Sequence, residues 1–209
     1  MSATTIHLLR HGETVTPDRL CGRTDVAVTA KGHASVVRRL EALAPQLLIS
    51  SPRQRAQRPA TEHAEAHGVA LNIDPRWAEI DVGIWEDRTF ADIRANDGER
   101  FAAYAASPET VTAPDGETWQ DFTSRIRGGL NDLIGAAPSP AGAADEGAPP
   151  TIVCHAGVIR AVLSEACGFT ARQAWAIHVG YACLVTMKVG LDDTGKLWGQ
   201  LISLSQDDA

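Results

Sequence analysis

The chain has 209 residues, of which 44% are hydrophobic and 22% are charged, as is usual for one globular domain that leaves room for a small lid. This composition excludes extensive disorder, and no apolar run approaches the roughly 20 residues that a membrane-spanning helix needs. A formal net charge of −7 argues against nucleic-acid binding, which usually goes with a surplus of basic residues.

Predicted strands and helices alternate through the first half of the chain. The strands cover residues 4–9, 47–50 and 69–73, and the helices cover residues 29–43 and about 51–68. Thr29 is placed to cap the first helix, while Ser51 caps the second and Pro52 occupies its first turn. This alternation predicts an α/β fold with a mostly parallel central sheet and helices on both faces.

The second half adds a small helical cap and closes the sheet. The expected elements are one or two short helices in 85–106, an amphipathic helix over 118–135, a strand over 151–155, a helix over 157–167 and a hairpin of 181–189 with 197–204. The stretch 136–150, rich in Pro, Ala and Gly, predicts a flexible surface loop. We therefore expect residues 1–209 to form a single domain, with the cap at about 85–117.

The cysteines, at positions 21, 154, 167 and 183, form neither a CxxC pair nor a disulfide framework. Cys154 and Cys183 lie in apolar runs, which is typical of thiols in a protein core. Free thiols indicate a reducing compartment, and the N-terminus shows no signal-peptide pattern. We therefore expect a cytoplasmic protein.

Reactive side chains follow four of the predicted strands. Arg10 and His11 follow the first, Arg55 the second, Glu79 the third, and His155 ends the late strand at 151–155. Because the sites of open α/β sheets form outside the carboxyl ends of the strands, we expect these residues to meet in one cleft.

Such a set suits phosphoryl transfer. Two guanidinium groups and a histidine bind a dianion, and Gly12 and Gly22 would let backbone N–H groups approach it closely. A neutral imidazole is a nucleophile, and Glu79 can protonate the leaving oxygen and then take a proton from water. Protein cations neutralise the developing charge, so we expect neither a metal nor another cofactor.

Six segments carry a resemblance to a known family: LLRHGET, LCGRTDVAVTAKG, SSPRQRA, AEIDVGIWE, PDGETW and VCHAGVIRAVL. In this order they resemble the histidine phosphatase superfamily, also called the phosphoglycerate-mutase-like family, over most of the chain. The resemblance implies a phosphoglycerate-mutase-like fold. It also implies that His11 becomes phosphorylated, Arg10 and Arg55 bind the phosphoryl oxygens, His155 adds a further donor, and Glu79 is the acid and later the base.

The same resemblance implies roles for the residues around this set. The backbone of Cys21, Gly22 and Ala156 matches stretches that touch substrate, and Glu117 matches an acidic residue with a structural task. Pro17 stands where many relatives have Asn, which removes one polar contact near the phosphate and stiffens the loop.

The sequence after Glu79 and the short cap resemble the phosphatase branch, α-ribazole phosphatases in particular. A mutase must shield its phosphohistidine from water, which a short cap does poorly. We therefore expect a metal-independent phosphomonoesterase that acts on a small phosphorylated metabolite, with α-ribazole 5′-phosphate as a candidate. A phosphoglycerate mutase and a non-catalytic module that binds phosphorylated ligands are the alternatives.

Some polar residues have two possible uses. His63 and His67 lie one helical turn apart and suit a metal, but the sequence shows no third ligand, which favours a solvated helical face. Arg88 and Tyr104 in the cap, with its other arginines, are candidates for substrate selection or equally a solvated face.

The expected partner is a small-molecule phosphate ester, with neither nucleic acid nor membrane involved. The oligomeric state stays open, a homodimer included, because no self-complementary patch can be read from the sequence.

Overall fold

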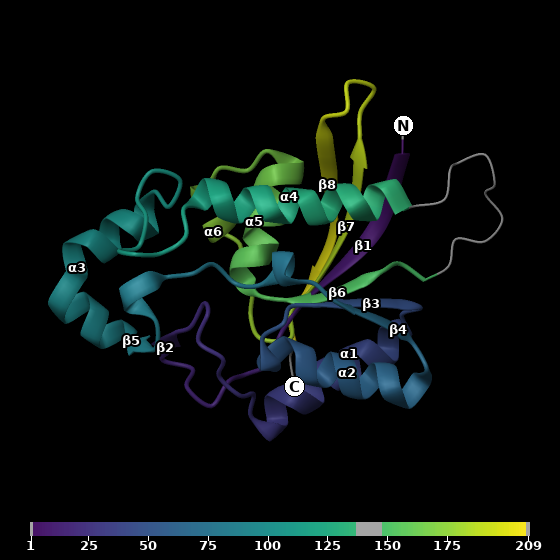
Figure 1. The fold of residues 1–209 in the computed structure, drawn as a ribbon, viewed down its shortest axis with the longest axis horizontal. Helices are drawn as coiled ribbons and strands as arrows, with labels where there is room; N and C mark the ends of the chain where they lie inside the picture. Colours follow the sequence, from purple (N-terminus) through teal and green to yellow (C-terminus); the bar gives the residue numbers. More distant parts are fainter. Residues whose placement is uncertain (1, 137–147, 208–209) are drawn as a thin grey trace.

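The computed structural model describes residues 2–136 and 148–207, and its centre is a six-stranded sheet in the order β4-β3-β6-β1-β7-β8 (Figure 1). The strands are β1 (Ser2–Arg10), β3 (Leu47–Ser50), β4 (Ala70–Ile73), β6 (Thr151–Cys154), β7 (Leu184–Leu191) and β8 (Leu197–Ser205). The first four named run parallel, and β7 and β8 add antiparallel neighbours. The predicted mostly parallel α/β sheet is confirmed, and so is the closing hairpin.

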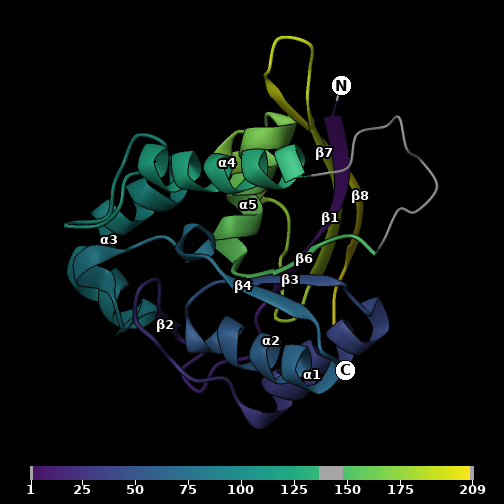
Figure 2. The same ribbon diagram turned by 45° about the vertical axis from the view of Figure 1, so that its right-hand side comes forward.

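Helices cover both faces of this sheet (Figure 2). On one face lie α1 (Ala30–Leu43) and α2 (Gln54–His67), and on the other lie α4 (Trp119–Ala136) and α5 (Ala156–Cys167). Successive strand residues point to opposite faces, so Leu9 and Leu48 pack with α1 and α2, whereas Leu8 and Ile49 pack with α4 and α5. Burial on both faces is why these strands read as continuous apolar runs.

The two helices of the lower face begin differently. Thr29 caps α1 as predicted, since its side chain accepts a hydrogen bond from the Gly32 N–H at 2.9 Å. The prediction that Ser51 caps α2 and Pro52 opens it is wrong: α2 begins at Gln54, after an N-cap position without a side-chain cap. The Ser51 hydroxyl lies 2.7 Å from the His155 ring instead, so the chain turns into the helix only after this contact.

The cap consists of η2 (Gly83–Trp85), α3 (Phe90–Ala106) and a ribbon of β2 (Arg19–Leu20) with β5 (Arg88–Thr89). Asp97 inside α3 has non-helical angles (φ −148°, ψ 28°), so the segment is two short helices joined at a kink, as predicted. The Asp97 carboxylate accepts a hydrogen bond from the Trp85 indole at 2.6 Å. This bond ties the kink to the rest of the cap.

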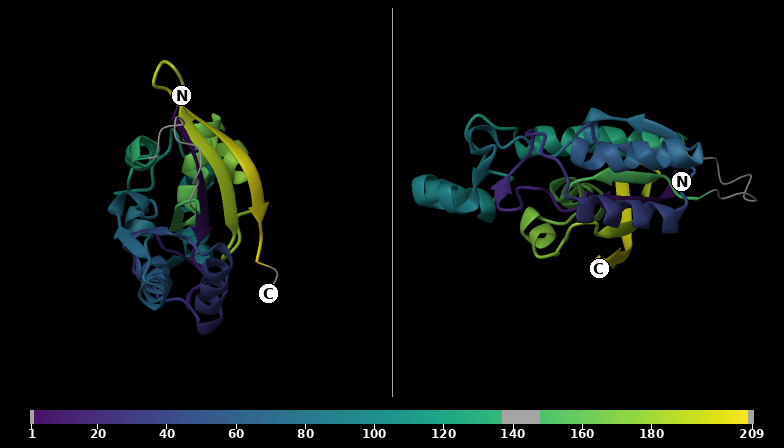
Figure 3. Two further views of the ribbon diagram at one scale, coloured as in Figure 1. Left: turned by 90° about the vertical axis from the view of Figure 1, so that its right-hand side faces the viewer. Right: turned by 90° about the horizontal axis from the view of Figure 1, so that it is seen from below.

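The short strands β2 and β5 were not predicted, and neither were η1 (Pro75–Trp77) and α6 (Ala171–Trp175). A capping box of Thr170 and Gln173 starts α6. Figure 3 shows β7 and β8 (yellow) at one edge of the molecule, and beyond β8 the chain returns to α1, where Arg38 pairs with Asp207.

Most of the predicted flexible loop, residues 137–147, lies outside the described residues. Among the residues that are described, none of the helices combines the length and the apolar character needed to cross a bilayer.

Candidate active site

The structure brings the five predicted catalytic residues together. Arg10 ends β1 and His11 follows it, His155 follows β6, Arg55 lies in the first turn of α2, and Glu79 lies between η1 and η2. The rings of His11 and His155 meet edge-on with centroids 5.2 Å apart. Arg55 Nε donates a hydrogen bond to His155 Nδ1 at 3.2 Å.

His11 is held as a neutral ring with one nitrogen left free for chemistry. Its Nδ1 lies 2.8 Å from the Gly12 carbonyl oxygen, which only accepts hydrogen bonds, so Nδ1 carries the proton and Nε2 keeps its lone pair. Burial holds the pKa of His11 well below the usual imidazole value, and the charges of Arg10 and Arg55 lower it further. A neutral imidazole with a free nitrogen is what a nucleophilic histidine requires.

His155 is fully buried and also neutral. Its Nδ1 accepts from Arg55, so the proton lies on Nε2, which donates to Ser51 Oγ at 2.7 Å. Burial, followed by the charge of Arg55, holds the pKa of His155 well below its usual value. Both ring nitrogens of His155 contact protein groups. Its role as a hydrogen-bond donor to the phosphoryl oxygens therefore remains a prediction, and it requires that Nε2–H turn from Ser51 to the ligand. Nothing in the local sequence pattern had indicated a role for Ser51 beyond helix capping.

Arg10 and Arg55 are held by carbonyl groups and an aromatic ring, and neither has a carboxylate partner among the ion pairs of residues 2–136 and 148–207. Arg10 donates to the Val179 carbonyl at 2.8 Å and lies over the Tyr181 ring, 4.1 Å from its centroid. Burial lowers the pKa of both arginines. One buried cation and one half-buried cation without a fixed anion make a site for an anionic ligand.

Cys21 and Gly22 are placed to orient Arg55. Their carbonyl oxygens accept from Arg55 Nη2 at 3.0 and 2.8 Å, and the Thr24 carbonyl accepts from Nη1 at 2.7 Å. The Gly22 N–H donates to the Glu86 carboxylate, so in this structure it already has a partner within the protein. Contact of this backbone with substrate therefore remains a prediction only.

The glycines at 12 and 22 are explained by packing of the chain itself. A Cβ atom on Gly12 would lie 1.9 Å from the Gly32 carbonyl oxygen at the start of α1. A Cβ atom on Gly22 would lie 1.9 Å from the Ile80 carbonyl oxygen. Glycine allows these close backbone approaches, and the approaches fix the two loops that flank His11 and Arg55.

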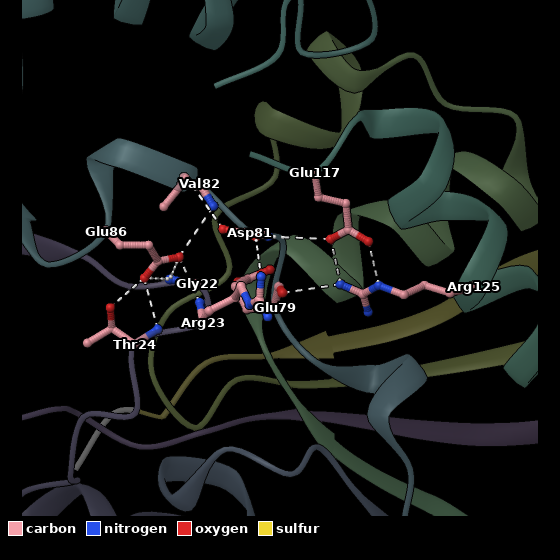
Figure 4. A network of polar contacts seen from close by, with 10 residues as sticks. Gly22, Arg23, Thr24, Glu79, Asp81, Val82, Glu86, Glu117 and Arg125 are labelled. Carbon is pink, nitrogen blue, oxygen red and sulfur yellow. Dashed lines mark hydrogen bonds and ion pairs between the residues drawn. The ribbon is translucent and has the colours of Figure 1, made fainter. Parts of the chain in front are cut away.

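Glu86 fastens the loop that holds Arg55 (Figure 4). Its carboxylate accepts from the backbone N–H groups of Gly22, Arg23 and Thr24 at 3.2, 2.7 and 2.9 Å, and from that of Val82 at 3.3 Å. The N–H groups of the loop thus donate to the Glu86 carboxylate, while the carbonyl groups of the same loop accept from the Arg55 guanidinium. Sequence reasoning missed Glu86 because its contacts with Gly22, Arg23 and Thr24 span more than 60 residues of the chain.

Glu79 presents its carboxylate at the start of α5. Its Oε2 accepts from the Gly157 N–H at 3.0 Å, and its Oε1 accepts from the Ile80 N–H at 3.0 Å. The Glu79 charge acts on both Arg10 and Arg55, where it opposes the lowering of their pKa by burial. The carboxylate therefore lies near both cations, as an acid–base group for their ligand must.

Arg125 on α4 holds the Glu79 loop in place (Figure 4). It donates to the carbonyl oxygens of Arg76 and Ala78 at 2.7 Å and to that of Glu79 at 3.1 Å. The Glu117 carboxylate receives two further bonds from Arg125, at 2.7 and 2.9 Å. Glu117 thus has structural contacts, as expected. Arg125 was missed, since one arginine beside an apolar helical stripe is a weak signal.

Arg160 is a second arginine that the sequence analysis missed. It lies on α5, which begins at Ala156 directly after His155, and its guanidinium lies 5.0 Å from the centroid of the Trp175 ring. Burial lowers the pKa of Arg160, and the charge of Glu79 opposes this. Its Nε has no hydrogen-bond partner among the described residues. The guanidinium is thus a further cation near Glu79; its only sequence signal was a cation in an apolar run.

The cap residues have different surroundings. Tyr104 is buried and packs edge-on against Trp85, with ring centroids 5.5 Å apart. Burial and the nearby charge of Glu79 raise the pKa of Tyr104. Tyr104 therefore lies near Glu79, so α3, which carries it, lies beside the site. Arg88 pairs with Asp92 on the cap surface.

An α/β sheet whose strand ends bring a neutral histidine, two arginines without carboxylate partners among the described residues, and a carboxylate into one place suits phosphoryl transfer. Comparison with known families agrees: the histidine phosphatase superfamily (branch 1) matches residues 6–197. The chain belongs to this superfamily, as its motifs had implied.

The curated relatives include proteins named as a phosphatase and as a probable mutase. Glucosyl-3-phosphoglycerate phosphatase of Mycobacterium tuberculosis is 31% identical over 169 residues, which cover 78% of this chain and 74% of that protein. A Cronobacter sakazakii protein named probable phosphoglycerate mutase is 30% identical over 172 residues, which cover 79% of this chain and 76% of that one. The chain is thus similar to enzymes that remove and enzymes that move phosphoryl groups.

Solved structures show the same fold. The native structure of mycobacterial glucosyl-3-phosphoglycerate phosphatase superposes with a TM-score of 0.83 at 26% identity, covering 95% of this chain and 96% of that one. An α-ribazole phosphatase from Shigella flexneri gives a TM-score of 0.76 at 22% identity, over 97% and 96% of the two chains. The expected phosphoglycerate-mutase-like fold is confirmed.

Proposed function

We propose that this protein is a metal-independent phosphomonoesterase that hydrolyses a small phosphorylated metabolite through a phosphohistidine at His11. The observation that carries the proposal is the state of His11: its Nδ1 is fixed by the Gly12 carbonyl, and its Nε2 accepts no hydrogen bond from the described residues and lies in the field of the Arg10 and Arg55 guanidinium groups. The Nε of Arg10 also has no hydrogen-bond partner among the described residues, which supports an anion as the missing partner.

The chemistry uses the chain's own groups in two steps. Arg10 and Arg55 bind the phosphoryl dianion, and His11 Nε2 attacks phosphorus. The P–O ester bond breaks, and Glu79 gives its proton to the leaving alkoxide. In the second step Glu79 takes a proton from water, the water oxygen attacks phosphorus, and the P–N bond breaks. Inorganic phosphate leaves, and His11 and Glu79 return to their starting protonation states.

We further propose that the substrate carries a second anionic group beside its phosphate. Support comes from Arg160, whose partly unpartnered guanidinium lies near Glu79. A glucosyl-3-phosphoglycerate, the compound in the name of a 31% identical relative, has such a group in its carboxylate. α-Ribazole 5′-phosphate, the candidate suggested by the sequence, has none, so a comparison of the two esters tests this part.

A rapid-quench experiment with ³²P-labelled ester tests the intermediate. We expect acid-labile, base-stable label on the wild-type protein and none on His11→Ala. His33→Ala is the matched control, because His33 pairs with Glu62 on the helix surface. Hydrolysis should be unchanged by chelators. Turnover without a labelled intermediate, or a strict requirement for an added divalent metal, would contradict the proposal.

A mutase is the second candidate, favoured by the 30% identical relative named as one. Phosphoglycerate isomers mixed with a bisphosphate primer separate the two activities. Release of phosphate faster than interconversion of the isomers supports the phosphatase, and the reverse order supports the mutase. Any turnover that His11→Ala abolishes excludes the non-catalytic phospho-ligand-binding module.

A further inference from the structure

A second cluster of ligating side chains lies on α1 and α2. Glu41 comes from the last turn of α1, and His63 and His67 lie one turn apart at the end of α2. Their potential ligand atoms all lie within 4.8 Å of one another. The two helices lie side by side on one face of the sheet (Figure 1). At 1.5 Å per residue, His63 is about 12 Å along α2 from Arg55, so the cluster is separate from the candidate active site.

The three groups already converge on one oxygen atom. Glu41 Oε1 lies 2.8 Å from His67 Nε2 and 3.3 Å from His63 Nδ1, and the two rings have centroids 4.4 Å apart. Ligand atoms around tetrahedral zinc, with Zn–N and Zn–O bonds of about 2.0–2.2 Å, lie about 3.3 Å from each other. Only small movements of the side-chain ends would therefore admit an ion.

His63 shows which group lacks a partner. Its side chain is only 2% exposed, yet its Nδ1 is not aligned for a hydrogen bond with Glu41 and has no hydrogen-bond partner within the part of the chain that the structure describes. Glu41 and His67 are about half exposed, which leaves an open side for water.

We propose that Glu41, His63 and His67 form a binding site for Zn²⁺, with water as the fourth ligand. Two imidazoles and one carboxylate are a ligand set that zinc commonly takes. The ion would join the end of α1 to the end of α2. The first turn of α1 packs against Gly12, and the first turn of α2 supplies Arg55. This role is structural and is independent of the reaction at His11. The sequence pattern had shown only the two histidines, because Glu41 lies on a different helix.

Calorimetric titration of the full chain with Zn²⁺ tests the site. We expect one ion per chain, with affinity at least tenfold weaker in Glu41→Gln and in His67→Ala. Both residues are half exposed, so these variants should keep the fold, which circular dichroism checks. His33→Ala, on the same helix pair, should bind zinc as the wild type does. Zn²⁺ should also raise the melting temperature of the wild type but not of the first two variants.

Spectroscopy with Co²⁺ in place of zinc reports the ligands directly. A tetrahedral site gives strong visible absorption, which should appear with the wild type and vanish in His67→Ala. Absence of zinc binding, or binding that Glu41→Gln and His67→Ala leave unchanged, would overturn the proposal. Because none of these measurements uses turnover, their failure is distinct from failure of the phosphatase proposal.

Discussion

Gly157 offers a way to displace the proposed acid–base residue without replacing it. A Cβ atom on Gly157 would lie 2.1 Å from Glu79 Oε1, whereas ordinary van der Waals contact begins near 3.4 Å. In Gly157→Ala the carboxylate must therefore retreat by about 1.3 Å, and it loses its 3.0 Å hydrogen bond from the backbone. A misplacement of about 1 Å at a reacting group costs about 10²-fold in rate, so kcat should fall by at least that factor.

The fold should tolerate this substitution. Gly157 lies in the first turn of α5, is not among the glycines with positive φ, and would contribute up to about 1 kcal/mol of helix propensity as alanine. Gly135→Ala, in α4 with open space around the added atom, is the matched control. Both variants should melt within a few degrees of the wild type, and only Gly157→Ala should lose activity.

The leaving group makes the assay specific. With an alkyl phosphate the first step needs a proton from Glu79, so Gly157→Ala should lose kcat in full. With p-nitrophenyl phosphate the leaving phenolate needs no proton, and a stopped-flow burst of one equivalent should precede slow hydrolysis of the phosphohistidine. A folded Gly157→Ala enzyme with wild-type kcat on the alkyl ester would refute the role given to Glu79.

Three other perturbations address the same pocket. The pKa values of His11 and His155 are lowered in the folded protein, so below about pH 6.5 only the unfolded chain takes up these two protons. Urea titrations should therefore show that the free energy of unfolding falls by about 1.4 kcal/mol for each ring per unit by which the pH is lowered. The variant His11→Asn should remove the contribution of one ring. Arg125→Lys, which loses the paired bonds to Glu117, should lower kcat about tenfold with little change in KM in steady-state assays. Inorganic phosphate at 100 times its Kd should stabilise the fold by about 2.7 kcal/mol, which is measured as a rise in melting temperature. If phosphate leaves the melting temperature of the wild type unchanged, the protein has no such anion site.

The meeting of Arg10, His11 and His155 could be predicted because it depends on local signals and one rule of topology. Each residue ends or follows a short apolar strand, and parallel strands end at the same edge of a sheet. The sheet itself followed from the alternation of elements. The family motifs then supplied roles for these residues, which remain predictions until the variants above are measured.

The supporting contacts could not be predicted in the same way. Ser51 was expected to cap α2, and its local pattern was right for that task, but the hydroxyl binds His155, 104 residues away. Glu86 and Arg125 likewise bind backbone groups of distant loops, and no spacing in the sequence marks such partners. Local patterns thus located the reacting groups, whereas the groups that orient them depend on tertiary packing.

Burial of the pocket has opposite consequences for its two kinds of base. It lowers the pKa of His11 far enough to keep the ring neutral, yet Arg55 stays charged, because the pKa of a guanidinium group starts far above neutral pH and remains there when burial lowers it. A lysine at this depth would lose its proton more readily and would offer no planar fork to the carbonyls of Cys21 and Gly22. The same dry environment can therefore hold a neutral imidazole, with one nitrogen unprotonated, beside arginines that keep their charge. A phosphoryl dianion matches the two charges of Arg10 and Arg55, which have no carboxylate partner among the described residues, so the substrate that we propose would find local positive charge on a chain whose net charge is −7.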